Sequence, residues 1–145
     1  MSSKSKVCFF FQNTKIHISN RKQLKKFILS VFKNENKKLQ SLNIIFCTDK
    51  AILDINRKYL KHDFYTDIVT FDLSESKAIH AEIYISVERV KENAQNLGFS
   101  FKTEIHRVIF HGILHLCGYG DKTKKEKEKM RIKEDYLLKN FKLSQ

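Results

Sequence analysis

The chain has 145 residues, the length of one ordinary domain, and 41% of them are hydrophobic, which is enough to build a core. Its charged fraction of 30% does not indicate a disordered chain, and no apolar run approaches the length of a membrane span. The three cysteines, Cys8, Cys47 and Cys117, are too few and too widely spaced for a disulfide scaffold. We therefore expect a single cytoplasmic domain over residues 1–145 that does not bind membranes.

The net charge of +12 favours a polyanionic partner, and it is unevenly distributed along the chain. Residues 1–40 have a net charge of +9 and residues 122–145 of +5, whereas residues 41–121 have a net charge of −2. Lysine far outnumbers arginine, so a biased genome is an alternative source of this excess. The basic ends of the chain are thus candidates for holding a nucleic acid.

Alternating apolar and polar residues, or short runs of apolar residues, predict strands. Apolar residues at helical spacing that follow a polar cap residue predict helices. The expected strands are residues 7–12, 15–18, 42–47, 67–73 and 81–86, with a turn at residues 13–14. The expected helix caps are Asn20, Asp49, Ser86, Ser100 and Thr123, and the last three helices end at Gly98, Gly118 and about Lys139. This order lacks a regular parallel β–α–β repeat. We predict an α+β fold with a small mixed sheet of about four strands packed with about five helices.

The segment from His111 to Asp121 has the residue spacing of a metal site. His111 and His115 are four residues apart, so on a helix both imidazoles project from one face and can share an ion. Gly118 can end the helix, which allows the chain to turn and bring Asp121 back as a third ligand. Three protein ligands and one open position are typical of a catalytic zinc site. We therefore predict a metal site at the end of a central helix; two helix histidines with ordinary hydrogen bonds are the alternative.

Metzincin proteases have the same ligand spacing, but they carry a glutamate general base directly after the first histidine. Here that residue is Gly112, which has no side chain. A glycine in mid-helix costs about 1 kcal/mol relative to alanine, so we expect another element to approach the helix closely at this position. The missing base disfavours a protease. A phosphodiester is a natural substrate for a basic protein with a Lewis acid.

Residues 111–121, His-Gly-Ile-Leu-His-Leu-Cys-Gly-Tyr-Gly-Asp, closely resemble the signature of the YbeY family of ribosomal RNA maturation endoribonucleases. Further matches lie upstream, at Leu53, Asn56, Tyr59, Asp63, residues 66–71 and residues 82–86. The resemblance implies a zinc-dependent, single-strand-specific endoribonuclease that processes the 3′ end of small-subunit rRNA and acts in ribosome quality control.

The resemblance also implies the ligands and partners of the site. One Zn²⁺ per chain would be held by His111, His115 and Asp121. Single-stranded rRNA and the small ribosomal subunit are the expected partners, together with assembly factors or ribosomal proteins. Asp121 departs from the family, which usually has histidine there. Aspartate is a competent zinc ligand, although it can shift the metal preference.

A second departure is Leu60, which stands where the family commonly has an arginine that contacts the scissile phosphate. Arg57, Lys61 or His62 is expected to supply the positive charge instead. Of these we take Arg57 and His62 as the candidate catalytic residues, the histidine also for acid–base chemistry. The missing arginine leaves a second hypothesis, a ribosome-assembly binding factor whose metal site is structural.

Several other residues are expected to play structural parts. Glu82 matches an acid of the family, for which a structural role or a position beside the ligands is expected. Cys117 lies off the ligand face and is expected to be a buried thiol. Three further histidines belong to no ligand motif and are expected on the surface or in the core: His17, His80 and His106.

Overall fold

The structure is a computed structural model that describes residues 5–61 and 66–145. Its elements in chain order are β1 (Val7–Phe11), α1 (Arg21–Asn34), β2 (Leu39–Cys47), α2 (Asp49–Ile55), the π-helical turn η1 (Asn56–Leu60), β3 (Ile68–Asp72), β4 (Ile79–Ser86), α3 (Val87–Leu97), α4 (Phe101–Leu116) and α5 (Lys124–Ser144). Within these residues the predicted α+β fold is confirmed. Across the same ranges, no helix combines the length and the apolarity that a membrane crossing needs.

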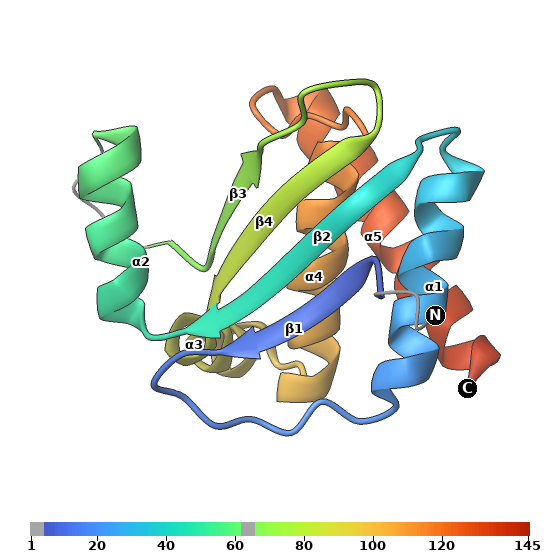
Figure 1. The fold of residues 1–145 in the computed structure, drawn as a ribbon. Helices are drawn as coiled ribbons and strands as arrows, with labels where there is room; N and C mark the ends of the chain where they lie inside the picture. Colours follow the sequence, from blue (N-terminus) through green and yellow to red (C-terminus); the bar gives the residue numbers. More distant parts are fainter. Residues whose placement is uncertain (1–4, 62–65) are drawn as a thin grey trace.

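The four strands form one mixed sheet in the order β1-β2-β4-β3. β2 pairs parallel with both β1 and β4, and β3 pairs antiparallel with β4 at the edge. In Figure 1, α4 lies behind the sheet and α5 further back, α1 lies to the right of the strands, and α2 lies at the left beside the β3 edge. Alternate residues of the two central strands are fully buried beneath the helices; they are Leu42, Ile44, Phe46, Ile83 and Ile85.

Helix α4 is the central helix of the fold, since ten of its sixteen residues are buried. It lies close to the sheet at Gly112, where a Cβ atom would be 2.8 Å from Cδ1 of Ile68 and 2.9 Å from Cδ1 of Ile83. The expected close approach at this glycine is therefore confirmed. It brings β3 alongside the helix that carries His111 and His115.

Two predictions at the N-terminal end of the chain were wrong. Residues 15–18 form no strand, because β1 pairs in parallel with β2 instead of folding back into a hairpin. The apolar alternation there arises from an irregular segment that buries Ile18 in the core while His17 stays exposed. Asn20 does precede α1, but its side chain makes no cap bond and donates to Oε1 of Gln145, 2.9 Å away.

The other cap predictions are largely confirmed. The side chains of Ser86, Ser100 and Thr123 accept the expected cap bonds, and α5 starts with the predicted capping box. The cap of α2 is Thr48 rather than Asp49, which is the first helical residue. Helix α5 runs beyond Lys139 because Phe141, one turn from its end, is buried against other rings of the core.

Changing Gly112 to glutamate, the metzincin residue, is expected to destabilise the fold by about 3 kcal/mol or more. The carboxylate would be forced between Ile68 and Ile83 with no partner. Gly112→Ala is the control, because its methyl group meets only the ends of two isoleucine side chains and alanine favours the helix by about 1 kcal/mol. Urea unfolding of both variants measures the difference. A glutamate variant as stable as the wild type would contradict this packing.

Candidate metal centre

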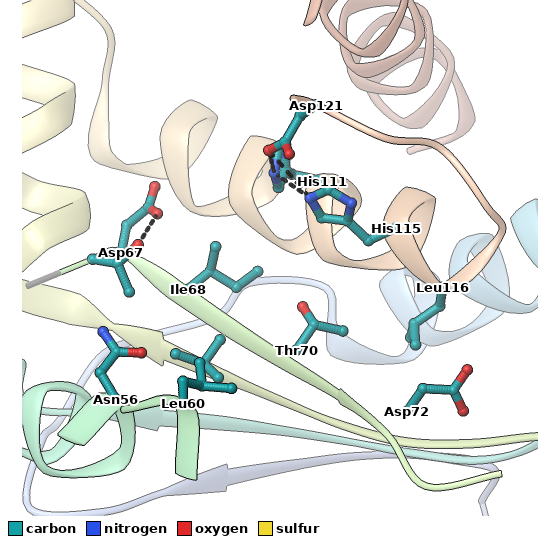
Figure 2. Close-up of a pocket in the computed structure, with 12 residues that line it drawn as sticks. Asn56, Leu60, Asp67, Ile68, Thr70, Asp72, His111, His115, Leu116 and Asp121 are labelled. Carbon is teal, nitrogen blue, oxygen red and sulfur yellow. Dashed lines mark hydrogen bonds and ion pairs between the residues drawn. The ribbon is translucent and has the colours of Figure 1, made fainter. Parts of the chain in front are cut away.

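The end of α4 is a turn that carries the chain back over the two histidines. Gly118 has φ +104°, which glycine adopts without strain. Its N–H donates to the carbonyl of His115, and the N–H of Tyr119 donates to the carbonyl of Leu114, both at 3.0 Å. This pair of bonds is the Schellman motif. The chain then reverses, and Asp121 lies beside the histidines before α5 begins (Figure 2).

The three predicted ligands come together in the structure. The Nε2 atoms of His111 and His115 are 2.9 Å apart, and Oδ2 of Asp121 is 3.3 Å from each of them. Within residues 5–61 and 66–145, no other group of three histidine, cysteine or acidic side chains lies close enough to share an ion. The alternative of two ordinary helix histidines is disfavoured by this convergence.

The other nitrogen of each imidazole is held by an acceptor. Nδ1–H of His111 donates to Oε2 of Glu134 at 2.6 Å, and Nδ1–H of His115 donates to the carbonyl of Tyr119 at 2.9 Å. An ionised carboxylate and a carbonyl can only accept, so each Nδ1 carries the proton. Each imidazole therefore directs Nε2 toward Asp121, as metal-ligating histidines direct their free nitrogen toward the ion.

The donor set fits a divalent cation. When both imidazoles are neutral, two nitrogen lone pairs and a carboxylate oxygen face each other at short distance, an arrangement that a cation would stabilise. Four-coordinate zinc with bonds of about 2.0–2.1 Å keeps its ligand atoms about 3.3 Å apart. The two separations of 3.3 Å to Asp121 match this value, and the 2.9 Å between the histidine nitrogens is somewhat shorter. Nitrogen and oxygen donors of this kind suit zinc and neighbouring transition metals.

Negative charge around the ligands also favours a cation. Burial lowers the pKa of His111, but the hydrogen bond and charge of Glu134, followed by the charges of Asp121 and Asp67, raise it above its usual value. Burial in turn raises the pKa of Asp67, although His111 opposes that shift. The same field that stabilises a proton on His111 would stabilise a metal ion at Nε2.

Glu134 is itself held in place by Arg107 of α4. Nη1 of Arg107 lies 3.2 Å from Glu134 and 3.0 Å from Asp135, and its Nε lies 3.4 Å from Glu104. Only 5% of the surface of Glu134 is exposed, and a buried carboxylate without a partner is costly. The guanidinium of Arg107 offsets this cost. The sequence reasoning missed Glu134. The available signal was an acid on the buried stripe of α5, whose other members are Met130, Leu137 and Phe141.

A cleft of about 480 Å³ opens between β3 and the ligand face of α4. Figure 2 shows Thr70 and Asp72 of β3 on one side of it and the histidines on the other. Asn56 and Leu60 of η1 also line it, so position 60, for which the resemblance implied an arginine, does face this cleft. Its lining includes no lysine or arginine among the described residues.

Of the two candidate catalytic residues, the structure describes only Arg57. Arg57 is exposed on η1 and is absent from the described lining of the cleft, and Lys61 is exposed directly after that turn. His62 lies outside the described residues. The roles of Arg57 and His62 therefore stay predictions.

The residues expected to be structural lie away from the ligands. Ile83 of β4 faces α4, so its neighbours Glu82 and Tyr84 lie on the opposite face of the sheet. Oη of Tyr84 donates a hydrogen bond of 3.2 Å to Glu82. Cys117 is buried, and burial with the charge of Glu35 raises its pKa to about 12. His106 is a core histidine, and burial followed by Lys102 lowers its pKa to about 4.

Fold and site together define an α+β protein with a candidate His–His–Asp metal centre open to a cleft. A sequence model described as "Endoribonuclease YbeY" matches residues 9–142. Proteins named Endoribonuclease YbeY from Cytophaga hutchinsonii and Flavobacterium psychrophilum are 48% identical over 91% of this chain and 47% identical over 82% of it, and the matches cover 93% and 85% of those proteins. This chain belongs to the YbeY family of endoribonucleases, which are hydrolases.

A solved structure is similar as well. The solution structure of a protein from Thermotoga maritima matches with a TM-score of 0.63 and 26% identity. The match covers 93% of this chain and 88% of that one. The likeness therefore extends over most of the chain, and it supports the predicted fold.

Replacing Glu134 with glutamine is expected to weaken metal binding about 10- to 100-fold, since the partner of His111 loses its charge. Glutamine keeps the shape of the side chain, and Glu128→Gln on the exposed surface of the same helix is the matched control. Zinc affinity is measured by competition with a chromophoric chelator. A Glu134→Gln protein with wild-type affinity and an intact circular dichroism spectrum would contradict the role of this hydrogen bond.

Proposed function

We propose that this protein is a zinc-dependent endoribonuclease that cuts single-stranded RNA and acts in maturing the 3′ end of small-subunit rRNA and in ribosome quality control. Membership of the YbeY family supports the reaction class. The observation that carries the metal dependence is the convergence of His111, His115 and Asp121, with both Nδ1 atoms already bound to acceptors. The proposed location is the cytoplasm, and the proposed partners are the small ribosomal subunit and the proteins that assemble it.

In this proposal His111, His115 and Asp121 hold one Zn²⁺ per chain. When bound, the ion supplies Lewis-acid polarisation of a phosphate oxygen or of water. Glu134 and the Tyr119 carbonyl keep the imidazoles in the protonation state that zinc requires. The cleft beside β3 would accept a nucleotide next to the scissile phosphate, with Thr70 and Asn56 as hydrogen-bonding side chains in its wall.

Arg57 and His62 are proposed to supply the charge and the proton transfer of the reaction. Both are polar side chains within two to three residues of Leu60, the position that faces the cleft. A guanidinium cation stabilises the negative charge that develops on the phosphate, and an imidazole can exchange protons near neutral pH.

A binding factor with a structural metal is the second candidate function. The observation that favours it is the described cleft lining, where Leu60 stands in place of a cation and no lysine or arginine is present. A protein of this kind would bind the small subunit through its basic ends and would need the metal only for its fold.

His115→Ala is expected to lose bound zinc and to reduce RNA cleavage by about a thousandfold or more, because several kcal/mol of charge stabilisation disappear with the ion. The matched control is His17→Ala, which removes an exposed histidine far from the ligands in sequence. Zinc is measured by mass spectrometry of the purified protein, and cleavage with single-stranded and duplex oligoribonucleotides. Undiminished cleavage by the metal-free His115 variant would rule out the proposed mechanism.

Arg57→Ala and His62→Ala are expected to behave differently from the ligand variant. Each should keep a full complement of zinc while cleavage falls about tenfold to a hundredfold, the usual size of an acid–base or charge contribution. The pH–rate profile of the His62 variant should lose one limb. Wild-type cleavage by both variants would exclude these two residues as the catalytic pair.

A further inference from the structure

Two hollows of the molecular surface meet at the candidate ligands. The second hollow, of about 430 Å³, lies between α4 and α5 with part of α3 in its wall. It shares Asp67, His111 and Asp121 with the cleft beside β3. A single strand of nucleic acid that reaches the ligands through one hollow can therefore continue into the other.

The second hollow carries cations, whereas the first cleft does not. Helix α5 contributes Lys127 and Arg131 to its lining. They are four residues apart, so they share one face of the helix, and Glu134 follows on that same face. The helix that holds the imidazole of His111 in place thus also aligns two positive charges beside it.

Both cations are available to a ligand. The side chains of Lys127 and Arg131 are exposed, and within the part of the chain that the structure describes neither forms an ion pair. The third cation in the lining, Arg107, is buried and bound to Glu104, Glu134 and Asp135. Free phosphate oxygens would therefore find their charge partners on α5 and not on α4.

The two hollows differ in their cations and not in their acids. Asp67 and Asp121 line both of them, but the described lining of the cleft beside β3 has no lysine or arginine to offset its carboxylates, whereas the second hollow has Lys127 and Arg131 in addition to the paired Arg107. A ribonucleotide placed in the cleft beside β3 would bring its base and sugar, which are neutral, against that strand. The backbone phosphates next to it would take the basic side.

We propose that Lys127 and Arg131 form the binding site for RNA backbone phosphates adjacent to the scissile one, and that they fix the direction in which the strand crosses the metal centre. This inference rests on the proposed endoribonuclease function. The arginine can bind a phosphate through two parallel hydrogen bonds, and the lysine adds a mobile point charge. Of the basic residues after position 121, these two are placed in the lining next to the ligands.

The test compares two double variants of α5. Lys127→Gln with Arg131→Gln removes the proposed phosphate site, and Lys125→Gln with Lys139→Gln removes two exposed charges of the same helix that do not line the second hollow. Glutamine is a good helix former, so both proteins should fold. Binding of a fluorescein-labelled single-stranded oligoribonucleotide is followed by polarisation over a range of KCl concentrations, with gels to check that the RNA stays intact.

The Lys127/Arg131 variant should bind about tenfold more weakly in ~0.1 M salt, since it loses charged hydrogen bonds. Its plot of log affinity against log salt should be shallower by about 1.4, because each lost phosphate contact on a single strand removes about 0.7. Its zinc content should match the wild type, and Lys127→Arg with Arg131→Lys should retain most of the binding. The Lys125/Lys139 variant should keep the wild-type slope.

Equal slopes for the two glutamine variants would overturn the phosphate site, even if the wild type cleaves RNA. A wild type that binds RNA without cutting it would instead refute the proposed enzyme, while a selective change of slope would still support the phosphate site. The two failures are therefore distinguished by separate measurements of binding and cleavage.

Discussion

The hydrogen bond between Nδ1 of His111 and Oε2 of Glu134 is the contact on which the site depends. It joins the two helices that carry the ligands and the basic residues, and it determines which nitrogen of His111 is free. Because Glu134 is buried, its charge would be costly without His111 and Arg107 beside it. Helix α5 is thus both part of the core and part of the candidate metal centre.

Two glycines set the geometry of the ligand helix. At Gly112 the absence of a side chain lets α4 lie against Ile68 and Ile83, which brings β3 next to the ligand face. At Gly118 the positive φ ends the helix, and the Schellman turn brings the Tyr119 carbonyl to His115. A close approach and a tight turn, both permitted only by small side chains, therefore place three ligand atoms within hydrogen-bonding distance of one another.

Local patterns predicted much of this arrangement. The four-residue spacing of the histidines, the glycine stop and the capping box of α5 are encoded within a few residues each, and all are present in the structure. The strand predicted at residues 15–18 was wrong because apolar and polar residues alternate in this irregular segment as they would in a strand with one buried face. Which strand β1 pairs with depends on contacts with β2, more than thirty residues away.

The hydrogen-bond partner of His111 could not be predicted from local sequence either. Glu134 is 23 residues from His111 and belongs to no motif, so only the packing of α5 on α4 brings it to the imidazole. For the same reason the net charge was a poor guide to the site. Lys127 and Arg131 are two of many basic residues near the end of the chain, and their position relative to the ligands depends on how α5 is oriented.

The central claim is that the two Nε2 atoms and the Asp121 carboxylate bind one ion. Anomalous diffraction at the zinc edge, from crystals of the protein purified without chelator, tests it most directly. The account predicts a single strong peak bonded to Nε2 of His111, Nε2 of His115 and Asp121, with Glu134 still bound to Nδ1. An ion bound through Nδ1, an ion at other side chains, or no peak in zinc-saturated crystals would contradict it.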